Sequence, residues 1–502
     1  MNQKAYSDSF KVFLGLCSLL ILGNLFLAND YASIWTGTEA SMLLAAQDGT
    51  ATKPVSFLTQ MIYGIKGLSV FTLRLPTVLL LLFTGLIFFR YGKKIFGRDA
   101  VVLTMLVAAS SFLLITLAKI AGGDLYLLFA QIGHLIFTIL FVKQPSSKWR
   151  NASYVFLALG MLIHPISMGL WGLLLATVLG IRHAKKENVK TLFLPIGLAL
   201  VVIPMVGSFF LGGWDFSEFS LSYGQWSTST VFGLVIFGML PWLGFLPAAF
   251  VDLYKKMKKK EELAIIISAW LGAALISQSL SLVIVLSFMI AKQVWVLFNA
   301  GYPYLRLVKG FVLLNLIGTF CLVFLVLLGG ISWVGVEGYR PLLGLSAVYW
   351  MLSLLGVLGI FMRDRRVVIG GATFSGLMVM IIFWLAIYPL WDTYRKLPEA
   401  VVKTAATKNT SGVEKLTLYP AAWMSDNFMV YAKEEFTKIE MLSDSTNFKA
   451  QMKQPDHQVF VFDNKVLTQV DSVELKRGEY FKVKGGWGRM GSGGYVVGQG
   501  AK

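Results

Sequence analysis

Ionisable side chains at the ends of long apolar segments are the residues of this chain best placed to do chemistry. The stretch at residues 34–57, IWTGTEASMLLAAQDGTATKPVSF, carries Glu39 and Lys53, and Asp30 precedes it. Arg74 opens the next apolar segment in the sequence TLRLP. A carboxylate is a candidate general base, whereas ammonium and guanidinium groups hold phosphates through charge-assisted hydrogen bonds. These residue types predict a site that handles an anionic substrate at a membrane boundary.

Four more ionisable residues stand at comparable positions. Lys119 and Asp124 flank the turn in LAKIAGGDLYLLF, His164 precedes a proline, and Lys292 follows a later apolar segment. Each also has a structural interpretation. Arg74 and Lys119 would reach lipid headgroups, Asp124 would cap a helix, and His164 would stabilise a turn. Because acids and bases come from at least three loops on one face, we expect them to line a common pocket.

The amino-acid composition indicates that this pocket belongs to a membrane protein. Of the 502 residues, 56% are hydrophobic and 14% are charged, whereas a soluble domain carries about 25% charged residues. The fold class is therefore a polytopic α-helical membrane protein. The net charge of +18 is also a feature of nucleic-acid-binding proteins. Here the basic residues form short clusters between apolar segments, which indicates membrane topology and excludes nucleic acid as the partner.

Apolar segments of about 20 residues predict the membrane spans. Thirteen are expected, near residues 10–28, 72–89, 100–118, 124–142, 152–164, 166–181, 191–212, 230–251, 263–290, 293–308, 311–330, 343–362 and 367–389. The first segment predicts an uncleaved signal anchor. Within residues 1–390, the N-terminal segment and alternate loops then hold 23 basic residues on one side, and the loops on the other side hold six. By the positive-inside rule the N-terminus is cytoplasmic, and the odd number of spans places the C-terminus outside.

The chain divides into two parts by composition. Residues 1–390 form the transmembrane part, with a first external loop at 29–70 whose Glu39 begins an amphipathic helix. Residues 391–502 predict a small extracytoplasmic α/β domain that ends in the Gly-rich tail KGGWGRMGSGGYVVGQG. Within it, strands are expected at 416–421 and 458–463, and helices at 426–436 and 445–454.

The order of these elements resembles that of GT-C glycosyltransferases, in particular bacterial aminoarabinose transferases and protein O-mannosyltransferase-like proteins. The residues that carry the resemblance are Thr38-Glu39, Lys53-Pro54-Val55, Gly67 with Arg74-Leu75-Pro76, Lys119 with Asp124, His164-Pro165, and Lys292 with Tyr302-Pro303. The resemblance implies an enzyme that transfers a sugar from a polyprenyl-phosphate-linked donor to an extracytoplasmic lipid, glycan or protein. It also implies a multi-pass protein of the bacterial inner (plasma) membrane.

The implied reaction assigns a role to each candidate. Its transition state is oxocarbenium-like and its leaving phosphate needs positive charge nearby. The expected roles are catalytic for Glu39 and Asp30, donor-phosphate binding for Lys53, Arg74, Lys119 and Lys292, and support of the site for Asp124 and His164. The resemblance names no definite cofactor, and a bound divalent cation stays open. An acceptor that is already ionised, such as a phosphate or carboxylate, would need no strong base.

Two other functions stay open. The family pattern has an acidic pair where this chain has Thr38-Glu39, and often an acidic residue where it has Thr52. These departures are consistent with a catalytically silent scaffold in an envelope assembly. A lipid or solute transporter is the other alternative, although transporters place charges near the midplane and often contain repeated halves, neither of which is evident here.

Overall fold

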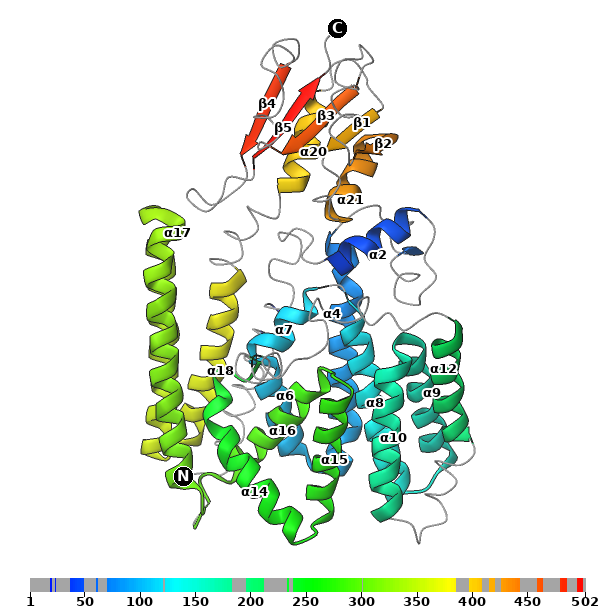
Figure 1. Cartoon of the computed structure of the whole chain (residues 1–502). Coiled ribbons are helices and arrows are strands. Elements are labelled where there is room, and N and C mark those ends of the chain that lie inside the picture. The colour runs from blue at the N-terminus through cyan, green and yellow to red at the C-terminus, as the bar shows by residue number, and fades with distance from the viewer. Residues whose placement is uncertain are drawn as a thin grey trace.

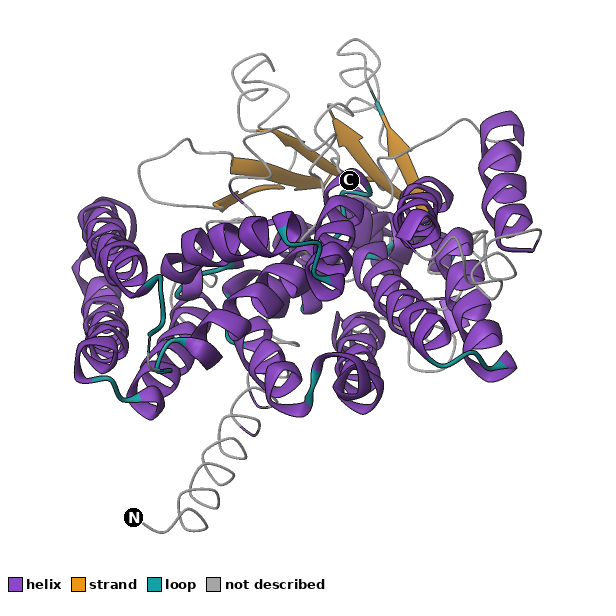
Figure 2. Ribbon diagram, turned by 90° about the horizontal axis from the view of Figure 1, so that it is seen from below, coloured by secondary structure: helices purple, strands orange, loops and turns teal. Residues whose placement is uncertain are grey.

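The computed structural model describes the chain at residues 19, 23, 37–48, 60–61, 70–120, 122–182, 196–211, 233, 238–299, 301–384, 397–408, 415–419, 426–442, 458–463, 479–484 and 494–499. In this part of the chain the helices form one large body, and a β-sheet with two further helices lies at one end of it (Figure 1). Figure 2 shows the same helical body from the opposite end.

Helices of the first half follow one another along the body. In chain order they are α2 (Gly37–Gln47), α4 (Val70–Ile87), η1 (Phe88–Gly92), α5 (Lys93–Phe96), α6 (Arg98–Ala109), α7 (Phe112–Ala118), α8 (Gly123–Lys143), α9 (Ser147–Ile163), α10 (Pro165–Arg182) and α12 (Ile196–Leu211). The helix expected in the first loop is α2, but it is not amphipathic, because its Glu39 is buried together with its apolar side chains. The apolar side chains of Leu43 and Ala46 are buried, Leu43 in a cluster with Leu73 and Val430, so protein rather than the membrane surface covers Leu43.

Helices of the second half carry the chain back and forth across the same body. They are η3 (Trp242–Phe245), α14 (Leu246–Lys258), α15 (Glu262–Ile276), α16 (Ser281–Val296), α17 (Leu305–Met362) and α18 (Arg365–Ile382). Three predicted spans are corrected here. The segment 263–290 is two helices, α15 and α16, and the segment 293–308 is not one helix. Residues 230–251 contain a turn, after which α14 begins at Leu246 and continues to Lys258.

Several helices have the length and composition of a membrane span. Among the described residues there are four, Leu73–Phe96, Gly123–Lys143, Leu343–Met362 and Arg365–Ile382, or five when the bent pair α6 and α7 is taken as one. Large apolar side chains such as Phe83, Phe320 and Met351 are at least half exposed. Such surface belongs in a bilayer. The chain is a polytopic helical membrane protein, while thirteen spans stay a prediction.

The element α17, 58 residues long, consists of two antiparallel halves. Nζ of Lys309 lies 4.7 Å from the ring centroid of Phe361, and the rings of Phe320 and Trp350 lie 5.5 Å apart. In a straight helix Lys309 and Phe361 would be separated by about 78 Å at 1.5 Å per residue, so the chain must reverse between them. As one residue number rises its partner's number falls, which is the pattern of a hairpin. The predicted spans 311–330 and 343–362 correspond to its two halves.

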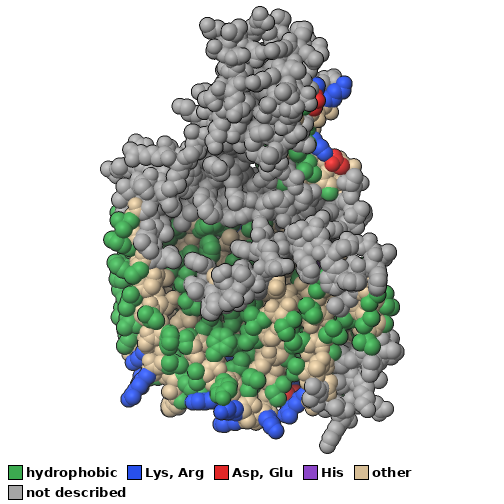
Figure 3. Space-filling view, viewed as in Figure 1, with side chains coloured by type: hydrophobic (Ala, Val, Ile, Leu, Met, Phe, Trp, Pro, Cys, Tyr) green, Lys and Arg blue, Asp and Glu red, His purple; other side chains and the backbone are tan. Residues whose placement is uncertain are grey.

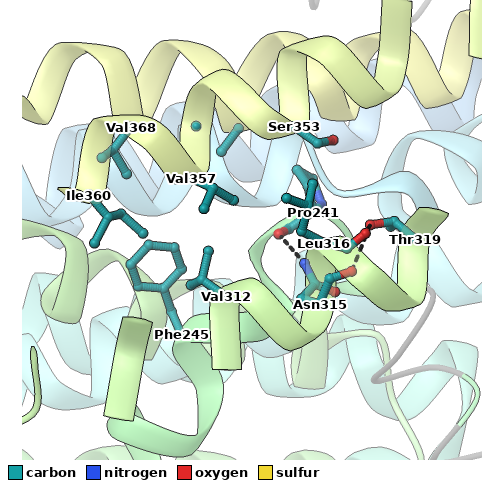
Figure 4. Close-up of a pocket in the computed structure, with 12 residues that line it drawn as sticks. Pro241, Phe245, Val312, Asn315, Leu316, Thr319, Ser353, Val357, Ile360 and Val368 are labelled. Atoms are coloured by element: carbon teal, nitrogen blue, oxygen red, sulfur yellow. Dashed lines mark hydrogen bonds between the residues drawn. The ribbon is translucent and has the colours of Figure 1, made fainter. Parts of the chain in front are cut away.

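Glycines fix the second half of α17 against α18. A Cβ on Gly371 would lie 2.3 Å from the backbone nitrogen of Gly356, and one on Gly359 would lie 2.7 Å from that of Val368. Such close backbone approach is typical of small-residue packing between membrane helices. In the first half of α17, Asn315 donates a hydrogen bond to the carbonyl of Pro241 at 3.0 Å (Figure 4). The hairpin is therefore held by α18 on one half and by the segment before η3 on the other.

The C-terminal sheet has the strand order β2-β1-β3-β5-β4. Its strands are β1 (Lys415–Tyr419), β2 (Lys438–Met441), β3 (Gln458–Asp463), β4 (Glu479–Lys484) and β5 (Gly494–Gln499), and its helices are α20 (Leu397–Lys408) and α21 (Asp426–Glu435). β1 is parallel to β2 and β3, while β5 is antiparallel to β3 and β4. The strands and the helix expected at 416–421, 458–463 and 426–436 are present. The helix expected at 445–454 lies outside the described residues, and the Gly-rich tail contains β5.

Basic side chains gather at the end of the helical body that lies away from the sheet. Figure 3 shows Lys and Arg side chains along the lower edge, below a broad hydrophobic surface. The run Lys255–Lys260 belongs to this end, where α14 turns into α15 (Figure 1). The sheet and α2 lie at the opposite end of the body (Figure 1).

Candidate functional site

Glu39 and Arg74 form a buried ion pair. Nε of Arg74 donates to one carboxylate oxygen of Glu39 at 3.0 Å, and a terminal guanidinium nitrogen donates to the other at 3.1 Å. Both side chains are fully buried. Two parallel hydrogen bonds fix the plane of the guanidinium as well as its position. Glu39 and Arg74, which were expected on one face of the protein, are therefore in direct contact, and their roles in a site stay a prediction.

The helices that carry this pair are held by apolar packing. Glu39 lies in the first turn of α2, and Arg74 lies in the first turns of α4. Ala40 and Leu43 of α2 pack in one cluster with Leu73, the residue before Arg74. The contact presses α2 across the beginning of α4, which brings the carboxylate to the guanidinium.

Thr77 connects the same turn of α4 to the end of α7. Its hydroxyl lies 2.7 Å from the carbonyl oxygen of Arg74 and 2.9 Å from that of Ala118. The residue after Ala118 is Lys119, which is fully buried. Thr77 thus ties the backbone that carries Arg74 to the backbone that carries Lys119, and the two basic residues become neighbours.

Lys119 packs against an aromatic ring from the other end of the chain. Its Nζ lies 4.6 Å from the ring centroid of Trp384, which follows the end of α18 and is fully buried. A cation over an indole face is attracted by the ring quadrupole. Burial, and to a smaller extent the positive charge of Arg74, lowers the pKa of Lys119 to about 7. Lys119 therefore changes its charge near neutral pH.

A bend between α6 and α7 brings Lys119 to this place. The two helices differ in direction by 70°, so the predicted straight span 100–118 is corrected to a broken one. At the break the hydroxyls of Ser110 and Ser111 donate to carbonyl oxygens of α6, at 2.7 and 2.6 Å. Serine hydroxyls bonded back in this way favour bending of a helix. Trp242 donates its indole N–H to Ser110 Oγ at 2.9 Å and fixes the bend.

The remaining predicted residues are placed as follows. Asp124 is half-buried in the first turn of α8, where the helix dipole favours a carboxylate. His164 precedes α10, and its Nδ1 accepts a hydrogen bond from the backbone N–H of Ser167 at 3.1 Å. This contact agrees with the interpretation of His164 as a turn residue. Asp30 and Lys53 lie outside the described residues.

Lys292 does not lie with Arg74 and Lys119, which corrects the expected set of phosphate ligands. It is near the end of α16, where its charge interacts with those of Lys256, Asp252 and Glu261 at the basic end of the body. The error has a physical cause: the chain turns at Ser277–Leu280 rather than after residue 290. The turn reverses the direction of α16 and carries Lys292 away from the sheet.

Sequence reasoning named neither Thr77 nor Trp384. Thr77 lies inside a segment expected to span the membrane, where a single threonine is ordinary. A tryptophan near the end of a span is a recognised signal for the membrane boundary, and Trp384 has that position in the predicted span 367–389. This signal indicates how deep Trp384 lies in the membrane. It does not indicate that Trp384 contacts Lys119, because that contact depends on the packing of α18 against α7.

The described residues contain no group of three or more His, Cys, Asp or Glu side chains that could hold a metal ion. Within that part of the chain both oxygens of Glu39 bind Arg74. These residues do not form a ligand set for a divalent cation, so no chemical step is assigned to one.

Comparison with known proteins identifies the architecture. Residues 54–207 match the family described as dolichyl-phosphate-mannose-protein mannosyltransferase. The structure is similar to that of ArnT from Cupriavidus metallidurans bound to undecaprenyl phosphate, with a TM-score of 0.69 and 16% identity over 97% of this chain and 98% of that one. The apo state of the same protein gives a TM-score of 0.67 with 15% identity over 99% and 98%. No curated protein matches the chain. The resemblance to GT-C glycosyltransferases is confirmed.

Proposed function

We propose that this chain, a polytopic membrane protein with the GT-C fold, transfers a sugar from a polyprenyl-phosphate-linked donor to an extracytoplasmic acceptor. The observation that carries the proposal is the juxtaposition of two buried basic side chains, Arg74 from α4 and Lys119 from the end of α7. Arg74 is held in place by its ion pair with Glu39, and two basic groups side by side are the arrangement that binds a phosphate through charge-assisted hydrogen bonds. A lipid phosphate is the leaving group of the proposed reaction, and positive charge beside it stabilises the charge that develops on it.

An apolar cavity supports a lipid-borne donor. It has a volume of about 470 Å³ and is lined by α4, η1, α6, α7, α8 and α16, with side chains that include Phe88, Met105, Leu114 and Ile132. The same α4 carries Arg74, and α7 leads to Lys119. An isoprenoid chain is the kind of group that such a cavity would accept, with its phosphate at the end of α7.

The proposed step is a substitution at the anomeric carbon. The bond from that carbon to the lipid phosphate oxygen breaks, and its electron pair stays on the phosphate beside Arg74 and Lys119. A bond forms to an oxygen of the acceptor, and when the acceptor is a hydroxyl its proton passes to a catalytic carboxylate. Lys53 and Asp30 are further proposed members of the site, as phosphate ligand and catalytic carboxylate, with Asp124 and His164 in support.

The role of Glu39 decides which acceptors the site suits. Its carboxylate accepts two hydrogen bonds from Arg74 and is fully buried. This arrangement favours Glu39 as the group that orients Arg74 over the role of general base. An acceptor that is already ionised, such as a phosphate or carboxylate, needs no base and is therefore the preferred class within this proposal.

The cluster of basic side chains at one end of the body supports its proposed orientation. With the basic end in the cytoplasm, as the positive-inside rule requires, α2, Lys119 and the C-terminal sheet lie on the extracytoplasmic side. The proposal includes thirteen spans, a cytoplasmic N-terminus and a bacterial inner-membrane location.

Donor turnover by matched charge-removal variants tests this function. The purified protein in nanodiscs is given undecaprenyl-phosphate-linked sugars with phosphate-, carboxylate- or hydroxyl-bearing acceptors, and release of undecaprenyl phosphate is measured. Lys119→Gln is expected to lower kcat by about 100-fold, the typical cost of losing one group that stabilises developing charge. Lys292→Gln, which removes the same charge at the opposite end, is expected to leave turnover unchanged. Equal effects of the two variants would contradict the proposed site.

A silent scaffold is the second candidate, because Glu39, the carboxylate expected to act as the catalytic base, is held in an ion pair with Arg74. A carboxylate held by two hydrogen bonds in a buried pair is a structural arrangement as well as an orienting one. For a scaffold, none of the donor and acceptor pairs would be turned over, and Lys119→Gln would leave the cellular role of the folded protein intact.

A further inference from the structure

Trp384, a buried aromatic residue, contacts the basic side chain of Lys119. Trp384 belongs to the segment that follows α18, far from Lys119 in the sequence, yet its ring centroid lies 4.6 Å from Nζ of Lys119. Both side chains are fully buried. A cation on an indole face is stabilised most when water is excluded from both groups. Because both groups are buried, the attraction between the Lys119 ammonium and the Trp384 ring is stronger than it would be at an exposed site.

Two further contacts hold Trp384 in this place. Gly376 of α18 packs on the bend between α6 and α7, where a Cβ would lie 2.0 Å from the carbonyl oxygen of Ser110. Phe383 packs edge-on against Phe112 in the first turn of α7 at 5.0 Å. Gly376 and Phe383 are seven residues apart, so they lie on one face of the helix. The end of α18 thus follows α7 as far as Lys119.

The indole face of Trp384 opposes two other influences on the charge of Lys119. Arg74 is close enough to disfavour protonation of Lys119, and burial acts in the same direction. The Arg74 guanidinium itself is paired with Glu39. The indole face acts the other way, since it favours the charged ammonium.

We propose that Trp384 is a positioning residue for the donor phosphate, whose ring holds the Lys119 ammonium in the charged and oriented state that a phosphate requires. This inference rests on the proposed function for its ligand. The contact with Lys119 can be tested without any lipid, so the two proposals can fail separately.

Three variants separate this role from simple packing. Trp384→Leu removes the π-face, Trp384→Phe keeps one, and Trp171→Leu removes another fully buried tryptophan, in α10. Thermal unfolding of all three gives the cost of the lost packing. Affinity for undecaprenyl phosphate, compared with that for the neutral alcohol undecaprenol, gives the effect on the phosphate.

The expected pattern follows from loss of the cation–π contact. Trp384→Leu is expected to weaken binding of undecaprenyl phosphate about tenfold and Trp384→Phe by less than about threefold. Trp171→Leu is expected to lower stability and leave the affinity unchanged. In a Lys119→Gln background, Trp384→Leu should have no further effect on affinity. Equal effects of Trp384→Leu with and without Lys119 would overturn the proposal.

A titration without lipid completes the test. In protein labelled with [13C]lysine, the Cε resonance of Lys119, identified by its loss in Lys119→Gln, is followed with pH. Trp384→Leu is expected to move the midpoint to lower pH, with Arg74 and Glu39 unchanged beside it, and Trp384→Phe is expected to keep it. An unchanged midpoint in Trp384→Leu overturns the inference. A shifted midpoint, together with equal affinity of the wild type for undecaprenyl phosphate and undecaprenol, supports the inference and contradicts the proposed function.

Discussion

Nζ of Lys433 bonds both carboxylate oxygens of Asp48, at 2.6 and 2.7 Å, although 385 positions separate the two residues. The contact joins α21 of the C-terminal part to the end of α2. Beside it, the amide of Gln47 donates to the carbonyl of Val430 at 3.4 Å. The helix that carries Glu39 is therefore held by α21 on one side as well as by α4 on the other.

Apolar packing, more than this ion pair, should hold α2 in place. Val430 is fully buried with Ala40, Leu43 and Leu73, whereas Asp48 and Lys433 are 44% and 32% exposed. We expect Val430→Ala to cost about 1.5–2.5 kcal/mol and Lys433→Ala about 0.2–1 kcal/mol. Hydrogen–deuterium exchange in residues 37–47 measures the difference. Equal or greater exchange in Lys433→Ala would show that the ion pair dominates.

The buried Glu39–Arg74 pair makes a sharper prediction. Glu39→Gln leaves a buried guanidinium without its counter-charge, so we expect it to destabilise the protein by about 3–5 kcal/mol. Replacing both residues, as in Glu39→Met with Arg74→Met, should recover most of that stability but not phosphate binding. Thermal unfolding and undecaprenyl phosphate affinity are measured on the same samples.

A partly exposed pair provides the control. Lys256 binds Asp252 at 2.7 Å with the two side chains 35% and 18% exposed. Lys256→Met is expected to cost less than about 1 kcal/mol, because solvent screens such pairs. A Glu39→Gln variant as stable as Lys256→Met would mean that the Arg74 guanidinium finds other compensation when the carboxylate is lost.

The sequence predicted the helices well where an apolar run was the whole signal. The segments 124–142 and 343–362 agree closely with α8 and with the span Leu343–Met362, because about 20 apolar residues are needed to cross a bilayer. The same rule failed at 263–290, where the polar residues of SQSLS (277–281) interrupt the run and the chain turns. A short polar run inside an apolar one was the missed signal, and Lys292 was misplaced as a result.

The sequence predicted which charged residues would lie near one another better than it predicted what they contact. Glu39, Arg74 and Lys119 were expected on one face because they stand at the ends of successive spans on the side with few basic residues. Their positions depend also on Val430 and Trp384, which come from segments hundreds of residues later. No local pattern connects residues so far apart, so packing in three dimensions had to supply both partners.

Substitution of Gly376 tests whether phosphate binding depends on the position of α18. A Cβ at this position would meet the Ser110 carbonyl oxygen at 2.0 Å and Pro241 at 3.2 Å. We expect Gly376→Ala to push α18 from the bend at a cost of about 1–3 kcal/mol, and to weaken phosphate binding by displacing Trp384. Thermal unfolding and lipid affinity measure the two effects.

Gly318→Ala is the matched control for that substitution. A Cβ at Gly318 has no atom within 4 Å, and alanine favours a helix over glycine by about 1 kcal/mol. The control is expected to be as stable as the wild type or slightly more so. Similar losses in both variants would mean that backbone flexibility, and not the contact with Ser110, makes Gly376 important.

The lowered pKa of Lys119 predicts how the affinity for undecaprenyl phosphate depends on pH. Its pKa is lowered from 10.5 to about 7, by burial first and by Arg74 second, so the ammonium is present below pH 7 and is lost as the pH rises above it. A phosphate monoester loses its second proton near about pH 6 and is mostly doubly charged throughout this range. Affinity for undecaprenyl phosphate should therefore fall about tenfold or more between about pH 7 and pH 8.5, since each unit above the pKa lowers the protonated fraction about tenfold.

The same proton linkage acts on folding with the opposite sign. Because the pKa of Lys119 is about 7 in the folded protein and 10.5 as the ordinary value, the unfolded chain binds this proton more tightly between those two pH values. Lys119 therefore makes the lipid-free protein more stable as the pH rises through that window. Lys119→Gln should abolish both dependences, which are followed by lipid affinity and by thermal unfolding. A wild-type affinity that stays constant across the window would mean that Lys119 does not meet the phosphate as a cation.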